Sequence, residues 1–442
     1  MSAAVPRWAS LLLISTQGVT NWGFRNALPS WLPLLCASAN FTDTQRALLM
    51  SSFFPGYILT QIPGSFMIQR YGAKIVLLVD MVVTATLCFC IPFATSAGGP
   101  RMLAPLLTVI GLSQGPLIPA LQVMKKDWLP SGPGRALILR LMSVPPMLSD
   151  MLATSIYPFL CVKFGWRTFP IVHGALTAGF LVLWKLFVQD KPPTTAAPQP
   201  TLDPPKAKGA EPTAAAAPAA EKKTIEWRIF TLPCVLSCMW AKFGSGVLSY
   251  ALEQWAPIYF VETLGCTPLQ VAGYLFWKTP LYTAVDFTGG AIESLMVTKG
   301  VPLVAIRRGS TALAATLQSL CAILFGMTSS ATMAALYYNF VVGLYGIHHS
   351  GFSSNLIEVG GEDTAIMNAI ANNLANVPGF LAPIAGAMLR ARRTPDGKPG
   401  SLMPLFAASA LFQLMGGLSF GLFASVRPAR EILAEQDAKK KA

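Results

Sequence analysis

The sequence predicts an all-α polytopic membrane protein with about twelve transmembrane helices in two six-helix halves. Of the 442 residues, 53% are hydrophobic and only 12% are charged, which is about half the charged fraction of an ordinary soluble protein. Apolar runs of about 20 residues recur along the chain, and each is long enough to cross a bilayer of about 30 Å. One long polar segment near the middle separates six of these runs from six more.

Twelve apolar segments are expected to span the membrane. In chain order they are 8–36, 45–69, 75–96, 102–124, 136–160, 167–188, 229–260, 269–296, 306–328, 331–357, 364–388 and 401–425. The second contains Pro55 and Pro63, which would break a soluble helix but are tolerated in a membrane bundle, where neighbours satisfy the freed backbone groups. Its small residues, such as Gly56 and Gly64, let another helix approach closely.

The polar segment divides the chain into domains. Residues 189–225 are rich in Pro, Ala and Lys and lack aromatic side chains, so they cannot bury enough apolar surface to fold. The expected organisation is a six-helix half at 1–188, a disordered cytosolic connector at 189–228, a second six-helix half at 229–426 and a cytosolic tail at 427–442.

The net charge of +13 reports topology. With the N-terminus inside, most Lys and Arg residues fall on cytosolic segments, which is the positive-inside pattern, so no nucleic-acid partner is indicated. Both termini are expected to be cytosolic. One loop disagrees, because Arg390, Arg392, Arg393 and Lys398 follow the eleventh span on the outside. Either this loop holds anions near the mouth or the last two spans are misplaced.

Several motifs follow one another in order along almost the whole chain. The segment Ser51–Gly64 leads into a basic turn at Arg70 and Lys74. The other segments are Asn21–Arg25, Gly111–Gly115, Tyr250–Phe260, Gly351–Asn355, and Asn372 with Pro378 and Pro383. Together they resemble the anion:cation symporter branch of the major facilitator superfamily, which includes vesicular glutamate transporters, sialin, sodium/phosphate and plastid phosphate transporters and bacterial sugar-acid symporters. The resemblance implies the major facilitator fold, whose two halves rock around a site at the midplane.

Four positions depart from the pattern of that branch. Gln114 stands where the family usually has Glu, Leu107 where an Arg is common, and Phe24 where some bacterial members have an acidic residue. Ser245 replaces an Arg of the vesicular glutamate transporters. The resemblance therefore implies that the usual proton-coupling carboxylate and part of the cationic site are missing.

Arg25 on the first span is the leading candidate for binding an anion. A charge inside a bilayer costs at least about 2.5 kcal/mol, and the guanidinium fork suits carboxylate or phosphate; the alternative is a structural ion pair or a snorkelling side chain. Trp22 shares its helix face. Further binding candidates, for which helix packing is the competing interpretation, are Tyr57, Ser353, Ser354, Asn355 and Asn372.

Charges of the second half, together with Asp150 on the fifth span, can replace the missing ones. Lys242 or Lys278 is expected to supply the positive charge. The replacement coupling group is expected to be one of three carboxylates, and interhelical salt bridges are the alternative. These carboxylates are Glu253, Asp286 and Asp150. The pair His348 and His349 can shuttle protons, although the sequence places no acidic residue beside it.

Other intramembrane charges have simpler interpretations. The basic turn at Arg70 and Lys74 and its counterpart at Arg307 and Arg308 are expected to form cytosolic gate contacts. Asp80, near the cytosolic end of a peripheral span, is interpreted as structural.

These features predict a secondary transporter of organic or inorganic anions, such as phosphate and carboxylates, working by alternating access as an ion-coupled symporter or an exchanger. A major facilitator carrier of a neutral or cationic solute, or a non-transporting sensor derived from the fold, is the alternative. No enzyme is expected, because His173, His348 and His349 do not cluster at one membrane face. No cofactor is expected beyond a coupling proton or sodium ion. The expected partners are the lipid bilayer and a small anionic solute, for a monomer.

Overall fold

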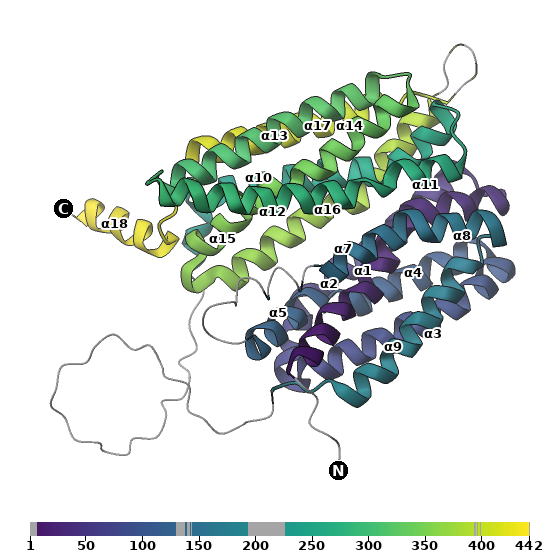
Figure 1. Cartoon of the computed structure of the whole chain (residues 1–442), viewed down its shortest axis with the longest axis horizontal. Coiled ribbons are helices and arrows are strands. Elements are labelled where there is room, and N and C mark those ends of the chain that lie inside the picture. The colour runs from purple at the N-terminus through teal and green to yellow at the C-terminus, as the bar shows by residue number, and fades with distance from the viewer. Residues whose placement is uncertain are drawn as a thin grey trace.

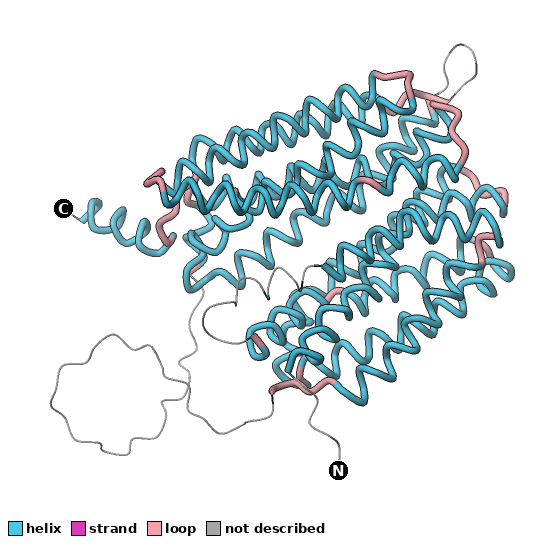
Figure 2. The backbone as a smooth tube through the Cα atoms, in the orientation of Figure 1, coloured by secondary structure: helices cyan, strands magenta, loops and turns pink. Residues whose placement is uncertain are grey.

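The computed structural model describes residues 7–129, 138, 142, 144–192, 226–392, 395, 397 and 399–441. These residues are almost entirely helical and contain no strand, and short connections join the helices (Figure 2). Residues 193–225 of the expected connector, most of 136–143 in the expected fifth span, and the loop residues Arg393 and Lys398 lie outside the described residues.

The first half contains six spans, of which two are built from more than one helical piece. They are α1 (Arg7–Ser38), α2 (Asp43–Tyr71), α3 (Ala73–Gly98), α4 (Pro100–Gln114) followed by α5 (Leu117–Trp128), α7 (Val144–Met151) followed by η1 (Leu152–Ile156) and α8 (Tyr157–Phe164), and α9 (Thr168–Phe187). The break between α4 and α5 falls at Gly115 and Pro116, where proline removes a backbone donor.

The second half repeats this arrangement of six spans. They are α10 (Pro233–Ile258) with η3 (Tyr259–Thr263), α11 (Pro268–Phe276) with α12 (Lys278–Thr298), α13 (Leu303–Met327), α14 (Ala331–Gly343) with η4 (Leu344–Ser350) and α15 (Phe352–Gly360), α16 (Thr364–Ala391), and α17 (Met403–Phe423). Short helices η2 (Trp227–Thr231) and η5 (Gly361–Asp363) flank them, and α18 (Ala429–Lys441) follows. The predicted all-α fold of about twelve spans in two halves is confirmed.

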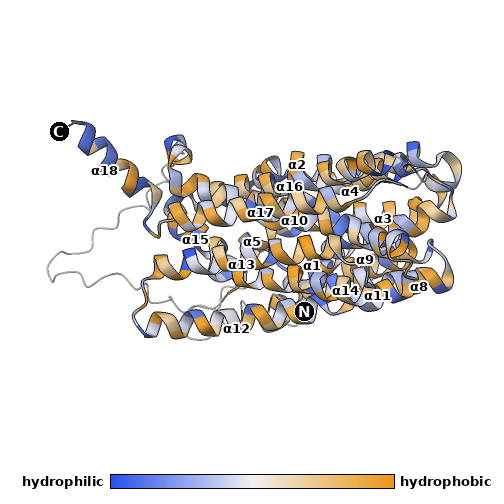
Figure 3. Ribbon diagram, turned by 90° about the horizontal axis from the view of Figure 1, so that it is seen from above, coloured by the Kyte–Doolittle hydropathy of each residue, from blue (hydrophilic) through white to orange (hydrophobic). Residues whose placement is uncertain are grey.

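The two halves lie side by side with their long axes roughly parallel (Figure 1). Each half begins and ends at the same end of the bundle, here named the terminal end, where α1 and α10 start and α9 and α17 finish. The opposite end, named the distal end, holds the loops 39–42, 264–267 and 328–330. Helix α18 projects from the terminal end and is mainly hydrophilic (Figure 3).

Six stretches of the described chain are long and apolar enough by themselves to cross a membrane. They are Ala73–Gly98, Pro100–Lys125, Thr168–Phe187, Leu303–Met327, Ile366–Ala391 and Met403–Phe423. Polar residues of other helices, among them α1, α7 and α12, make the contacts that define the site described below.

Small residues allow close helix packing within and between the halves, as the sequence predicts for the second span. A Cβ added at Gly111 of α4 would lie 2.0 Å from the carbonyl oxygen of Phe53 on α2, so these two backbones touch. Between the halves, α2 packs along α16. A Cβ at Gly379 of α16 would lie 2.4 Å from the ring of Phe54.

An ion-pair cluster joins the halves at the distal end. Arg46 of α2 lies 3.0 Å from Glu262 of η3, and Arg390 of α16 pairs with the same carboxylate. Arg390 is buried. The basic loop that disagreed with the charge pattern therefore contains one arginine that binds a carboxylate, and α16 and α17 occupy the predicted spans.

Candidate functional site

Arg25 lies in the middle of α1, at the interface between the halves. Its Nη2 donates a hydrogen bond of 3.0 Å to Oδ1 of Asn376 on α16. Pro29, one turn later, has no N–H, so the carbonyl of Arg25 lacks its usual donor within the helix. No carboxylate lies within ion-pair distance of Arg25 among the described residues.

Three aromatic rings surround the guanidinium of Arg25. Its Cζ lies 5.1 Å from the ring centre of Tyr57, 5.3 Å from that of Tyr250 and 5.6 Å from that of Phe54. At these distances the negative faces of the rings stabilise the cation without using its N–H donors. Tyr250 also donates a hydrogen bond of 2.6 Å to Asn376. These contacts leave N–H donors of Arg25 available.

A chain of amides extends from Arg25 across the interface between α16 and α2. Asn376 donates to the carbonyl of Asn372, whose Nδ2 donates a hydrogen bond of 3.1 Å to Oε1 of Gln61 on α2. The structure therefore brings together three predicted residues, Arg25, Tyr57 and Asn372. The sequence interpretation missed Asn376, although it lies one helical turn after Asn372 and shares its face.

Two adjacent pockets meet beside Arg25, and Asn26, Pro29 and Glu253 line both of them. The first pocket is completed by Arg25, Leu28, Met50, Phe54, Tyr250 and Gln254. The second is completed by Ser30, Asp150, Thr154, Pro257, Leu275, Lys278 and Tyr338. Glu253 forms no ion pair within the described part of the chain. It is therefore the one predicted coupling carboxylate that lines both pockets without an ion-pair partner there.

In the second pocket, an ion pair connects the halves. Lys278 of α12 lies 3.0 Å from Asp150 of α7. Asp150 also accepts hydrogen bonds from Thr279 at 2.8 Å and from Asn26 at 3.0 Å. Lys278 is only 3% exposed, so burial makes each partner costly without the other. The salt-bridge alternative stated for Lys278 and Asp150 is the arrangement that the structure shows.

Lys242 has neutral neighbours, unlike Lys278. Its Nζ lies 3.4 Å from the hydroxyl of Tyr345 and 5.6 Å from the ring centre of Phe352.

One residue of the histidine pair on η4 contacts a carboxylate. Nδ1 of His349 lies 2.8 Å from Asp286 of α12. The sequence interpretation that the histidine pair has no acidic neighbour was therefore wrong, because α12 packs against η4 and brings Asp286 to it.

The remaining predicted binding residues lie away from the two pockets. Trp22 packs against the apolar core of the first half near the terminal end. Ser353 is half-buried, and Ser354 donates to the carbonyl of His349. Asn355 donates to the carbonyl of Ser425 and to Glu358. Their predicted contact with a solute remains a prediction, and packing explains Trp22 and Asn355 as the structure places them.

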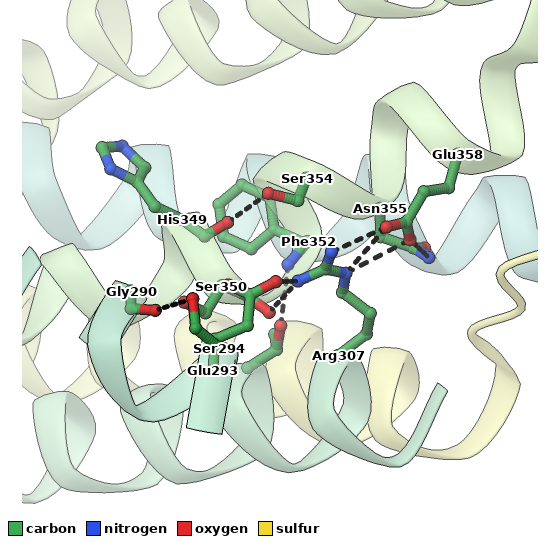
Figure 4. Close-up of polar contacts among 11 residues, drawn as sticks. Gly290, Glu293, Ser294, Arg307, His349, Ser350, Phe352, Ser354, Asn355 and Glu358 are labelled. Carbon is green, nitrogen blue, oxygen red and sulfur yellow. Dashed lines mark hydrogen bonds and ion pairs between the residues drawn. The ribbon is translucent and has the colours of Figure 1, made fainter. Parts of the chain in front are cut away.

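The basic residues expected to form gates contact groups of their own half. Arg307 on α13 lies between Glu293 of α12 and Glu358 of α15, at 2.6 and 2.7 Å (Figure 4). Arg308 donates to the carbonyl of Ala424. Lys74 donates from its backbone to Asp190 and from Nζ to the carbonyl of Lys185, and Arg70 lies over the ring of Tyr71.

Asp80 lies on α3, the span that the sequence analysis placed at the periphery of the bundle, and it is only 2% exposed. It accepts a hydrogen bond of 2.7 Å from Asn21 of α1 and one of 3.0 Å from Ser113 of α4. The packing of α3 against α4 and α9 encloses it. Within the described chain, no group of three or more His, Cys, Asp or Glu side chains is arranged to hold a metal ion.

Comparison with known proteins identifies the fold independently. The family model described as Major Facilitator Superfamily matches residues 14–383. Sialin from Ovis aries is 25% identical over 85% of this chain and 74% of its own length. Sodium-dependent phosphate transport protein 1, chloroplastic, from Arabidopsis thaliana is 26% identical over 95% of this chain and 79% of its own. These relatives confirm the resemblance drawn from the motifs.

A solved structure shares the whole architecture. A bacterial homologue of the human lysosomal transporter Spinster, in an inward-facing and unoccupied conformation, superposes with a TM-score of 0.70. The match covers 97% of this chain and 98% of the other, at 16% identity. At that identity the likeness concerns the fold alone.

Proposed function

The chain belongs to the major facilitator superfamily, and we propose that it is a secondary transporter of small organic or inorganic anions that works by alternating access. It is a multi-pass integral membrane protein, and the family consists of transporters, so it is not an enzyme. One observation carries the proposal: Arg25 lies between the halves with one neutral hydrogen-bond partner, three aromatic rings and no carboxylate in ion-pair distance among the described residues.

The proposed binding mode follows from the free donors of Arg25. A guanidinium carries five N–H groups in a planar fork that matches a carboxylate or phosphate. Asn376 accepts from one of them, and the three aromatic rings face the cation without a hydrogen bond to it. An anion at Arg25 would contact α1 of one half and the amides of α16 in the other. Phosphate is supported as a cargo class by the name of the plastid relative, which is called a sodium-dependent phosphate transporter.

Among the three coupling candidates, Glu253 fits best. Asp150 is bound to Lys278 and Asp286 to His349, whereas Glu253 shares the pocket of Arg25. The charged and titratable groups around it are Arg25 on α1, Asp150 on α7, Lys278 on α12 and Tyr338 on α14. Protonation of Glu253 would remove a negative charge that competes with the anion for Arg25, which would couple anion binding to proton binding.

The proposed transport cycle breaks and reforms contacts between the halves. The cluster of Arg46, Glu262 and Arg390 closes the distal end, and the pair of Asp150 and Lys278 joins the halves beside the site. Opening of the distal end requires both to separate, and a bound anion favours whichever state it contacts best. We place the terminal end, where Arg70, Lys74 and Arg307 lie, in the cytosol by the positive-inside rule, and we propose a monomer.

The test is uptake into proteoliposomes of purified protein, with labelled phosphate and a panel of carboxylates, under imposed proton or sodium gradients. Arg25→Ala is expected to lower uptake at least about 100-fold, because the charge and the fork both disappear. Arg25→Lys keeps the charge and is expected to retain partial uptake. The matched control is Arg101→Ala, since Arg101 is exposed at the start of α4. Undiminished uptake by Arg25→Ala would contradict the proposal and favour a neutral cargo.

The role of Glu253 has its own test in the same vesicles. Glu253→Gln mimics the protonated carboxyl and is expected to preserve exchange of anions across the membrane. The same variant is expected to lose accumulation driven by a proton gradient. Retained proton-driven accumulation in Glu253→Gln would exclude this carboxylate as the coupling group.

A further inference from the structure

The first half contains a buried carboxylate that the proposed anion site does not use. Asp80 of α3 accepts hydrogen bonds from Asn21 at 2.7 Å, Ser113 at 3.0 Å and Thr84 at 3.4 Å. All three donors are neutral. No Lys, Arg or His forms an ion pair with Asp80 within the described residues. A carboxylate at membrane depth is expensive, and hydrogen bonds from neutral groups leave its net charge uncompensated.

Two amide side chains of α1 lie beside Asp80, and each has an oxygen atom without a hydrogen-bond partner among the described residues. Asn21 donates through Nδ2 to Asp80, and its Oδ1 is one of these two oxygens. Gln17, one turn earlier on the same face of α1, also directs its amide group to Asp80, and its Oε1 is the other. Their exposed fractions are 1% and 0%. Buried polar atoms are nearly always paired, so two orphaned acceptors beside an uncompensated carboxylate indicate a missing positive ligand.

We propose that Asp80, Asn21, Gln17 and Ser113 form a binding site for a monovalent metal cation, Na⁺, inside the first half. Carboxylate, amide and hydroxyl oxygens are the donors that hard cations prefer. One carboxylate balances a single positive charge, whereas a divalent ion would leave a net charge in the membrane. A proton on Asp80 would supply one O–H donor, enough for one of the two unpaired oxygens, and would leave the other without a partner. A sodium ion between these groups would be a partner for the carboxylate and for both oxygens.

The position of the site links it to the anion site through α1. Asn21 and Arg25 are four residues apart, about 6 Å along the helix axis. A cation held by Gln17 and Asn21 would fix this segment of α1 against α3 and α4, and thereby fix Arg25. The same polar cluster includes Gln114, which donates to Thr84 at 3.4 Å. The carboxylate that the resemblance expects at position 114 is thus replaced, in this cluster, by Asp80 on the neighbouring helix.

This site goes beyond the proposed function and does not require it, so its first test uses binding rather than transport. The melting temperature of the purified full-length protein in detergent is measured in NaCl, KCl or choline chloride at equal ionic strength and pH. A ligand bound only by the folded state stabilises it by mass action. At tenfold saturation the expected rise in NaCl over choline chloride is about 2–4 °C. Equal melting temperatures in all three salts would overturn the proposal.

Variants assign the effect to Asp80. Asp80→Asn is expected to lose the Na⁺-specific rise, whereas Asp127→Asn, which removes a carboxylate on α5 of the same half, is expected to keep it. If Asp80→Asn does not fold, Gln17→Met serves instead, because it preserves the side-chain length and removes one oxygen donor. It is expected to raise the Na⁺ concentration for half-maximal stabilisation about tenfold. A Na⁺ response that survives in both variants would place the cation elsewhere and refute the site.

Two further measurements distinguish this proposal from its rivals. Stabilisation of the wild-type protein by acid pH, with no difference between NaCl and choline chloride, would identify Asp80 as a proton site and overturn the sodium assignment. In vesicles, loss of anion uptake with a preserved Na⁺ response would remove the proposed transport function and leave the cation site standing. Anion uptake without any Na⁺-specific stabilisation would refute the cation site and leave the proposed transport function standing.

Discussion

Two arginines, Arg307 at the terminal end of the second half and Arg25 at the interface between the halves, have opposite environments. Arg307 contacts two carboxylates, Glu293 and Glu358, and donates to the carbonyl of Ser350 at 2.8 Å (Figure 4). Arg25 contacts one neutral amide and the faces of three aromatic rings. Both side chains are charged groups on membrane-spanning helices, and the sequence alone marks both as unusual.

The difference teaches how to separate a structural arginine from a binding one. The charge of Arg307 is balanced by its neighbours, so removing it exposes uncompensated carboxylates rather than a ligand site. The charge of Arg25 is stabilised by aromatic quadrupoles, which leave its N–H donors free. Substituting the first is expected to affect stability, and substituting the second is expected to affect transport.

The largest expected effect on stability is at Arg307. Arg307→Met leaves Glu293 and Glu358 without a cation and should destabilise the fold by about 3 kcal/mol. In thermal unfolding of the detergent-solubilised protein, this corresponds to a fall in melting temperature of roughly 5–10 °C. Arg101→Met, at an exposed position, is the matched control and should change little. A fall in melting temperature as small as that of the control would show that the contacts of Arg307 with Glu293 and Glu358 do not stabilise the fold.

The pair of Asp150 and Lys278 tests whether a buried ion pair beside the site behaves as Arg307 does. Lys278→Met should destabilise the protein by about 3 kcal/mol, because Asp150 loses its cation at a largely buried position. The double variant Asp150→Asn with Lys278→Met should recover at least half of that loss, since no charge is left unpaired. Melting temperatures of the four proteins form a double-mutant cycle. Additive losses would mean that the two side chains do not interact.

Much of the fold could be predicted from the sequence because it depends on one-dimensional patterns. Apolar runs of membrane-spanning length predicted the twelve spans, and the polar segment 189–225 separated them into two halves. Small residues such as Gly56 and Gly64 predicted close helix contacts, and a Cβ at Gly56 would lie 2.3 Å from the carbonyl oxygen of Thr108 on α4. These patterns are local in the sequence, so they can be recognised without knowing which helices are neighbours in the fold.

The partners of each charge could not be predicted because they come from distant segments. Asp150 and Lys278 are separated by 128 residues; the sequence offered interhelical salt bridges as one interpretation of these charges but did not indicate which of them pair. Asp80 was interpreted as structural from its place in the third span, but the sequence did not show that α1 and α4 supply its polar partners. Asn376 of the site was missed for the same reason. Its significance depends on Arg25, 351 residues away.

A smaller effect is expected at Lys242, which resembles Arg25 rather than Arg307 because its neighbours are neutral. It lies eight residues before Tyr250 on α10, about 12 Å along the axis toward the terminal end. Lys242→Met is therefore expected to leave the melting temperature within about 2 °C of wild type. It is expected to raise the KM for anion uptake about tenfold by weakening an attraction on the path to Arg25. Lys299→Met, at an exposed position, is the control. An unchanged KM would limit the cationic site to Arg25.

The smallest effect is expected where a carboxylate and an arginine meet in solvent. Glu435 on α18 pairs with Arg427 at 2.5 Å, and the hydrogen bonds and charge of Arg427 lower the pKa of Glu435 below its ordinary value of 4.5. A depressed pKa contributes stability that is present above pH 4.5 and is lost as the pH falls through the lower value in the folded protein. The side chains of Arg427 and Glu435 are 49% and 56% exposed, so water and salt screen the pair. Hydrogen exchange of the α18 backbone, corrected for intrinsic rates, should therefore be constant between pH 7 and 5 and change less than about twofold in Glu435→Gln. A large loss of protection in that variant would mean that exposed pairs hold α18 as firmly as buried ones hold Arg307.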